Sequence, residues 1–244
     1  MIRFDGATKR FGGRVVVDAL TIEIRGGEVT ALLGPNGSGK TTTLKMAAGL
    51  IRPDGGSVTI ESRPAWESAA RADLAYLPQR VAFPEALTGR EIVEFYSALR
   101  GAPADSAQRA LRFAALNGAG GRAVGTYSGG MAQRLGLAVA TLPGARMLLL
   151  DEPGAALDPE GLAGFHRLLR EERGKRTVLF TSHQIAEVER VADRVLVLNR
   201  GRLVADVMRA ELPIGRATTE PAPLEKWYDS LVGASAAVGL GSRS

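Results

Sequence analysis

The sequence predicts an α/β fold with a mainly parallel central sheet, an N-terminal antiparallel β layer and a helical insert. Three observations support this fold class. Short, mostly apolar runs such as Val29–Leu33 and Met147–Leu150 are typical of buried parallel strands. The residues before position 33 instead form short β segments separated by paired glycines. Residues 82–143 carry helical patterns, which indicates an insert within the sheet-forming sequence.

Composition limits the classes of protein that this chain can represent. Its 244 residues suffice for one large α/β domain or two small ones. The chain contains no cysteine, which excludes a disulfide framework and a cysteine zinc site. No apolar run approaches the ~20 residues that a membrane span requires, and the N-terminus lacks a signal-peptide pattern, so we expect a soluble chain. The net charge is +5, but the positive residues are scattered among acidic ones and form no basic run with interleaved aromatic residues. No nucleic-acid partner is therefore expected.

The N-terminal layer is expected to contain strands at residues 2–4, 15–17 and 20–24, joined by glycine turns. Phe11 stands immediately before the first of these turns. Its ring could stack on a purine or pack beneath the turn, and the sequence leaves both interpretations open.

The most informative segment joins strand 29–33 to a helix expected over residues 42–48. It contains, in order, Gly34, Pro35, Asn36, Gly37, Ser38, Gly39, Lys40, Thr41 and Thr42. This spacing matches the P-loop pattern. Glycines let backbone N–H groups turn toward a phosphate, and the helix N-terminus adds partial positive charge. Lys40 can reach the β- and γ-phosphates of a nucleotide, and the Thr41 hydroxyl can bind Mg²⁺.

The helical insert, residues 82–143, contains recognisable helix starts. Thr88 and Glu91 form a capping box, and Asp105 is expected to cap a second helix. Ser128 is expected to cap a third.

Ser128 is followed by Gly129 and Gly130, which leave the first N–H groups of that helix open. The sequence holds one P-loop, so a second anion-binding helix start suggests contact with a γ-phosphate held by another subunit. A plain capped helix is the alternative.

Polar residues follow several predicted core strands. Asp151 and Glu152 come directly after Met147–Leu150, at the carboxyl end where open α/β sheets bind ligands. Asp151 is placed to hold Mg²⁺, and Glu152 to orient or deprotonate an attacking water. Gln79 follows another apolar strand and could bind Mg²⁺ or hold a water, although alone it also fits a surface residue. His183 could donate a hydrogen bond to the γ-phosphate or to the water.

The last third of the chain continues the α/β pattern. Asp158 is expected to cap a helix that ends near Gly174, and His166 in its middle is expected on the surface. A hairpin is expected around residues 199–201. Residues 213–223 are predicted to be a linker, 224–232 a short helix and 233–244 a disordered tail.

These motifs together resemble the ATP-binding subunit of an ATP-binding cassette (ABC) transporter, over about residues 1–210. In that family's order, residues 34–42 resemble Walker A, Gln79 the Q-loop, residues 127–131 the signature, residues 147–152 Walker B, residues 155–158 the D-loop and His183 the switch histidine. Phe11 matches the adenine-stacking aromatic. The resemblance implies an ABC ATPase domain at residues 1–212, with residues 213–244 as linker, helix and tail.

Some positions depart from the commonest family pattern. Tyr127 replaces the usual leucine of the signature, Met131 the usual glutamine, and Ala155 a serine or glycine of the D-loop. None of these changes removes a catalytic group. Residues 131–135 are similar to the signature helix of ATPases that serve ABC-2-type exporters, and residues 223–228 resemble a short motif that closes many of those chains. A narrower similarity is to the ATPase of the copper-processing system that matures nitrous oxide reductase, although nothing in this chain would touch the cargo.

The resemblance also implies a mechanism. Two such domains, expected to be identical, would enclose two ATP with Mg²⁺. The Walker A of one would face Ser128, Gly129 and Gly130 of the other, beside Asp158. Hydrolysis would separate the two domains, and the motion would pass to integral membrane permease subunits through the helical insert and the loop around Gln79. A cytoplasmic helix of the permease would dock into a groove lined by parts of residues 80–96. The chain would then lie at the cytoplasmic face of the cell membrane as a peripheral subunit.

Two rival functions remain to be compared. Soluble ABC ATPases that act on nucleic acid or ribosomes usually carry two cassettes or a long coiled coil, whereas this sequence shows one cassette and no sustained heptads. A small-molecule kinase built on a P-loop would need neither the Ser128 helix start nor Glu152 beside Asp151. Cargo, transport direction and the identity of the membrane subunits are outside what these residues specify.

Overall fold

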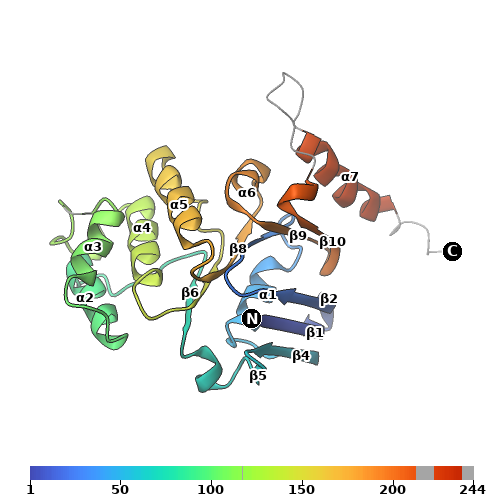
Figure 1. The fold of residues 1–244 in the computed structure, drawn as a ribbon, viewed down its shortest axis with the longest axis horizontal. Helices are drawn as coiled ribbons and strands as arrows, with labels where there is room; N and C mark the ends of the chain where they lie inside the picture. Colours follow the sequence, from blue (N-terminus) through green and yellow to red (C-terminus); the bar gives the residue numbers. More distant parts are fainter. Residues whose placement is uncertain (117, 213–222, 238–244) are drawn as a thin grey trace.

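The computed structural model describes residues 1–116, 118–212 and 223–237, and within them two β-sheets and the helices around them (Figure 1). The strands are β1 (Ile2–Phe11), β2 (Arg14–Ile24), β3 (Val29–Leu33), β4 (Gly55–Ile60), β5 (Arg63–Pro64), β6 (Leu74–Leu77), β7 (Met147–Leu150), β8 (Thr177–Ser182), β9 (Arg194–Asn199) and β10 (Arg202–Met208). The α-helices are α1 (Lys40–Ala47), α2 (Gly89–Leu99), α3 (Ser106–Phe113), α4 (Gly129–Ala140), α5 (Pro159–Glu172), α6 (Ile185–Val191) and α7 (Pro223–Ala237).

The central sheet has the strand order β10-β9-β3-β8-β7-β6. Its strands are parallel except for β10, which forms the expected antiparallel hairpin with β9. The wholly buried runs of β3, β7 and β8 explain the apolar sequences from which these strands were predicted. The predicted α/β class with a mainly parallel sheet is therefore confirmed.

The strand register brings several chain segments to one edge of this sheet. Leu33 at the end of β3 pairs with Ser182 of β8, and Leu150 at the end of β7 pairs with Phe180. Leu77 at the end of β6 pairs with Leu150. The segments that leave these strands therefore start side by side, which is the arrangement that positions a ligand site.

The antiparallel layer has the order β2-β1-β4-β5 and packs on the central sheet with α1 between them. The prediction of two strands between residues 15 and 24 is wrong, because β2 is continuous. Ala19 takes a left-handed backbone angle (φ 46°) in its middle. There the Ala19 N–H donates to the Thr8 hydroxyl and the Asp18 N–H to the Gly201 carbonyl, so long-range contacts absorb the irregularity.

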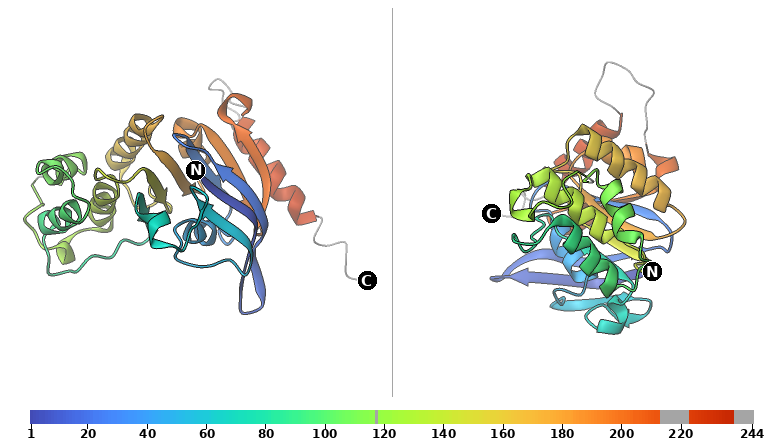
Figure 2. Two further views of the ribbon diagram at one scale, coloured as in Figure 1. Left: turned by 60° about the horizontal axis from the view of Figure 1, so that its bottom comes forward. Right: turned by 90° about the vertical axis from the view of Figure 1, so that its left-hand side faces the viewer.

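The predicted helical insert contains α2, α3 and α4, which form a hydrophobic cluster of their own at one end of the molecule (Figures 1 and 2). The capping box of Thr88 and Glu91 is present. Asp105 precedes α3 but does not cap it, so that prediction is wrong. Its backbone is helical rather than extended, and its carboxylate pairs with Arg109 at 2.8 Å.

Helices α4, α5 and α6 bury apolar side chains against the central sheet. His166 of α5 belongs to the buried side of this layer, with 6% of its surface exposed, so its predicted surface position is wrong. The apolar periodicity of α5 does not show where a packed neighbour, here α6, will lie.

Helix α7 lies at the opposite end from the insert (Figures 1 and 2). It confirms the helix predicted at residues 224–232, and it continues to Ala237, so the predicted disorder is wrong for residues 233–237. Leu224 is buried, and the Asn199 side-chain amide donates to the Val232 carbonyl at 3.1 Å. Of the linker predicted at 213–223, Pro223 is the first residue of α7 instead. Residues 213–222 and the tail from 238 onward lie outside the described residues.

Candidate functional site

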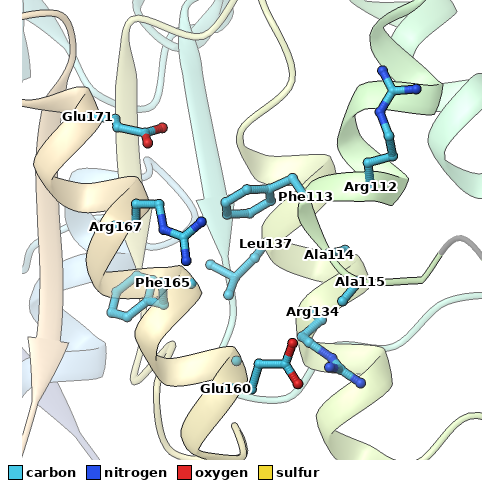
Figure 3. A pocket seen from close by; sticks show the side chains of 12 residues that line it. Arg112, Phe113, Ala114, Ala115, Arg134, Leu137, Glu160, Phe165, Arg167 and Glu171 are labelled. Carbon is cyan, nitrogen blue, oxygen red and sulfur yellow. The ribbon is translucent and has the colours of Figure 1, made fainter.

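Two cavities of similar volume are lined by different kinds of residue, and one of them contains the P-loop. One of about 330 Å³ lies between α3, α4 and α5, where Arg112, Arg134 and Arg167 are interspersed with Glu160 and Glu171 (Figure 3). No P-loop residue lines it. The other, of about 350 Å³, lies where the predicted catalytic segments meet. It is lined by Val16, Asn36, Gly37, Ser38, Gly39, Lys40, Thr41, Thr42, Gln79, Glu152 and His183.

Two glycines of the P-loop are required by close packing. A Cβ on Gly34 would stand 2.3 Å from the Leu198 carbonyl oxygen. A Cβ on Gly39 would stand 2.8 Å from the Val16 carbonyl oxygen, and Gly39 has a φ of 105° that disfavours other residues. The loop therefore packs directly against the backbone of β9 and β2, at positions where a side chain would not fit.

Lys40 is held at the start of α1, where its side chain is 5% exposed. Its ammonium donates to the Gly34 carbonyl at 2.7 Å and to the Pro35 carbonyl at 3.2 Å. Glu152 lies 3.8 Å away. Burial lowers the pKa of Lys40, and the carboxylates of Glu152 and Asp151 act in the opposite direction. The P-loop therefore holds a cation at the cavity wall.

Asp151 lies at the end of β7 and is almost completely buried. Its Oδ1 accepts hydrogen bonds from Thr41 at 3.1 Å and from Thr181 at 2.8 Å, while Oδ2 has no partner among the described residues. Burial is the main cause that raises the pKa of this carboxyl group. An unpaired carboxylate oxygen beside a threonine hydroxyl is a donor set that suits Mg²⁺.

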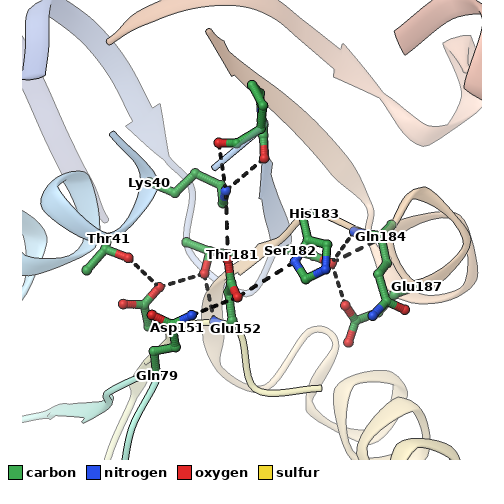
Figure 4. Close-up of polar contacts among 12 residues, drawn as sticks. Lys40, Thr41, Gln79, Asp151, Glu152, Thr181, Ser182, His183, Gln184 and Glu187 are labelled. Carbon is green, nitrogen blue, oxygen red and sulfur yellow. Dashed lines mark hydrogen bonds and ion pairs between the residues drawn. The ribbon is translucent and has the colours of Figure 1, made fainter. Parts of the chain in front are cut away.

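Glu152 is the point where the catalytic segments converge (Figure 4). Its Oε2 accepts a hydrogen bond of 2.9 Å from the Gln79 amide, and His183 Nδ1 lies 3.7 Å from the same oxygen. The backbone of Glu152 is left-handed, with φ 45°, and the Thr181 hydroxyl accepts its N–H at 2.7 Å. A non-glycine residue in this conformation is strained and persists only where its surroundings hold it.

The structure thus brings Lys40, Thr41, Gln79, Glu152 and His183 together, as the sequence predicted, with Thr42 and residues 36–39 in the same cavity wall. Gly34 and Pro35 contribute through their carbonyl groups.

Other predicted residues do not line this cavity. Phe11 is half exposed, with the Lys9 ammonium 5.5 Å from its ring centre. The Ser128 hydroxyl caps α4 by accepting the Met131 N–H at 3.2 Å, and Gly129 and Gly130 form the first turn. Asp158 caps α5 by accepting the Gly161 N–H at 2.9 Å.

Sequence reasoning missed two positions near the site. Thr181 holds both Asp151 and the backbone of Glu152, and its only signal was a hydroxyl at the end of an apolar strand. Glu187 of α6 is buried, which raises the pKa of its carboxyl group. An acidic residue in an amphipathic helix normally indicates a solvated face, so the sequence carried no signal for its burial.

Comparisons with known proteins agree with this geometry. The ABC transporter family model matches residues 17–155. The Nod factor export ATP-binding protein I of Burkholderia orbicola is 39% identical over 84% of this chain and 70% of that protein. The daunorubicin resistance ATP-binding protein DrrA3 of Streptomyces coeruleorubidus is 36% identical over 86% of this chain and 69% of that protein.

A solved structure shows the same fold. The dimeric structure of the ATP-binding cassette MJ0796 in a post-hydrolysis state, bound to ADP and Pi, aligns with a TM-score of 0.77 and 26% identity over 86% of this chain and 99% of that one. Within the described residues, no helix is both long enough and apolar enough to cross a membrane. The chain therefore belongs to the ABC transporter family, as one of its ATP-binding, ATP-hydrolysing subunits, and resembles those of exporters.

Proposed function

We propose that this chain binds and hydrolyses ATP through the residues of the P-loop cavity and drives export through separate membrane subunits. The observation that carries the proposal is the position of Glu152, which lies between Gln79, His183 and Lys40 at the cavity wall. The proposed domain is residues 1–212, with residues 82–143 as its helical subdomain and residues 213–244 as an appendage.

Each residue has a distinct proposed role. Lys40 and the N–H groups of the P-loop bind the β- and γ-phosphates. Glu152 orients the attacking water and takes its proton, and Gln79 holds the carboxylate in place through the 2.9 Å bond. His183 donates a hydrogen bond to the γ-phosphate. Cleavage of the bond between the β–γ bridging oxygen and the γ-phosphorus leaves ADP and phosphate.

Mg²⁺ fits the oxygen atoms beside the P-loop. The Thr41 hydroxyl, the unpaired oxygen of Asp151 and the amide oxygen of Gln79 would hold the ion. When bound, Mg²⁺ would neutralise charge on the β- and γ-phosphates. These residues are proposed as its ligands.

A second copy of the chain is proposed to complete each ATP site. Ser128, Gly129 and Gly130 present an open helix N-terminus but do not line the P-loop cavity of their own chain. A head-to-tail partner would bring them to the γ-phosphate, with Asp158 at the same interface and Phe11 against the adenine. The dimeric state of the similar MJ0796 cassette supports this arrangement.

Integral membrane permease subunits are the proposed partners, because similar chains are named for export of Nod factor and for daunorubicin resistance. The chain would then lie peripherally at the cytoplasmic face of the membrane. The similarity to the ATPase of the copper-processing system stays a prediction about the cargo of this chain.

The proposal is tested with a tagged Glu152→Gln variant. We expect it to bind ATP, to lose turnover and to elute as a dimer with ATP and Mg²⁺, because the amide cannot take the proton of water. Steady-state turnover near that of the wild type would remove Glu152 from its role.

The same variant, pulled down from solubilised membranes with ATP and Mg²⁺, tests the partner. Recovery of a stoichiometric polytopic membrane protein by mass spectrometry would establish the transporter. Recovery of ribosomes or nucleic acid, with a soluble dimer, would favour the alternative of a soluble ABC ATPase.

A further inference from the structure

Glu187 is a buried carboxylate that no step of the proposed mechanism uses. It lies on α6, four residues after His183, and 6% of its surface is exposed. Its Oε2 accepts a hydrogen bond of 2.5 Å from the Ser182 hydroxyl. Its Oε1 has no hydrogen-bond partner among the residues that the structure describes. A buried charged group with half of its acceptors unused is costly, so its position calls for a physical explanation.

The first contact of Glu187 organises the corner that carries His183. The Ser182 hydroxyl accepts the Gln184 N–H at 3.0 Å, and its single proton goes to Glu187. The hydroxyl therefore spans the corner from one side of His183 to the other (Figure 4). Without the Glu187 acceptor, this hydroxyl has only the Gln184 carbonyl at 3.4 Å to donate to.

The second contact of Glu187 is with the segment that follows Glu152. A Cβ built on Gly154 would stand 2.3 Å from Glu187 Oε1 and 3.2 Å from its Cδ. The carboxylate thus fills the space that a side chain at position 154 would need. Gly154 lies two residues after Glu152 and opens the loop that leads to Asp158.

We propose that Glu187 is a positioning residue, which holds the His183 corner and the segment after Glu152 in a fixed relation for ATP hydrolysis. The two segments leave neighbouring strands, β8 and β7, and Thr181 already ties them on the side of Asp151. Glu187 contacts both segments, because it accepts the Ser182 proton and packs against Gly154. In this proposal, the two contacts of Glu187 help to maintain the 3.7 Å separation of His183 Nδ1 from Glu152 Oε2. This inference rests on the proposed function of Glu152 and His183.

The test compares substitutions of Glu187 in purified, full-length chain by steady-state ATPase assay and nucleotide titration. Glu187→Ala is expected to lower kcat on the order of tenfold to a hundredfold, as small misplacements of catalytic groups do. The KM for ATP should change less than about twofold, because the P-loop contacts are untouched. Glu187→Gln retains an oxygen that accepts the Ser182 proton and should restore kcat to within about twofold of the wild type. Glu189→Ala, on the same helix but partly exposed, is the matched control.

Gly154→Ala supplies an independent arm that does not depend on the folding of the Glu187→Ala variant. Its Cβ must displace the Glu187 carboxylate, so it should also lower kcat at unchanged KM. In the double variant Glu187→Ala/Gly154→Ala, the two losses should not multiply, because each acts through the same contact.

Three results would overturn the proposal: a wild-type kcat in Glu187→Ala or Gly154→Ala, a loss that Glu187→Gln does not restore, or multiplicative losses in the double variant. A failure of the proposed function would give a different result. The wild-type chain would then show no ATPase activity, or an activity that Glu152→Gln does not abolish.

Discussion

Replacing Lys40 with alanine is expected to weaken ATP binding about a hundredfold to a thousandfold. The ammonium is anchored by two backbone carbonyls of the loop that cradles phosphate, at 2.7 and 3.2 Å, and its side chain is 5% exposed. The anchored group therefore spends little conformational entropy when a phosphate arrives. Hydrogen bonds to charged groups contribute about 1.5–3 kcal/mol each, so two bonds to phosphate oxygens near the lower end of that range amount to about 3–4 kcal/mol. Each 1.4 kcal/mol corresponds to about tenfold in Kd.

Isothermal titration calorimetry of purified wild type and Lys40→Ala with ATP and Mg²⁺ measures this loss directly. Lys45→Ala is the matched control, because Lys45 carries the same charge on the same helix but is exposed. Its Kd should stay within about threefold of the wild-type value, since exposed charges are screened. The reasoning would be refuted by an unchanged Kd in Lys40→Ala, or by an equal loss in Lys45→Ala, which would indicate a general charge effect.

Three further predictions concern stability in the absence of nucleotide. Gly34→Ala should lower Tm by about 3–10 °C, because the new Cβ would meet the Leu198 carbonyl. The control Gly26→Ala, which has open space around it, should change Tm by less than about 2 °C. Equal Tm values for the two variants in scanning calorimetry at matched concentration would contradict this prediction. Burial, together with nearby arginines, lowers the pKa of His166, so the folded state resists its protonation and loses stability as pH falls below about 6.5. The Tm of His166→Gln should therefore fall less than that of the wild type between about pH 7.5 and about pH 5. Parallel curves of Tm against pH for the two proteins would disprove this role of His166. Thr88→Ala removes the hydroxyl acceptor of the capping box and should lower the free energy of unfolding by about 1 kcal/mol, or Tm by about 2–4 °C. A chemical-denaturation midpoint equal to that of the wild type would show that this cap does not stabilise the fold.

Much of the site could be predicted because its chemistry is encoded in short segments. Glycine spacing, a following helix start and Lys40 specify a phosphate cradle within a few residues. Apolar runs that end in Asp151, Gln79 or His183 indicate strands that deliver polar groups to one edge, because parallel strands share an orientation. What could not be predicted depends on contacts distant in sequence. Burial of His166 requires knowledge of where α6 packs, and the exposure of Phe11 depends on the surroundings of its turn.

By itself, then, the sequence determined the fold class and the segments proposed to bind nucleotide, since both follow from local periodicity and spacing, while the ABC family followed from the resemblance of its ordered motifs. Only the tertiary structure decided how Lys40 is anchored, that Thr181 supports the left-handed backbone of Glu152, and that Glu187 packs against Gly154. The physical reason is that a buried polar group is placed by whichever partner the packed strands and helices bring to it, and that partner has no fixed distance along the chain.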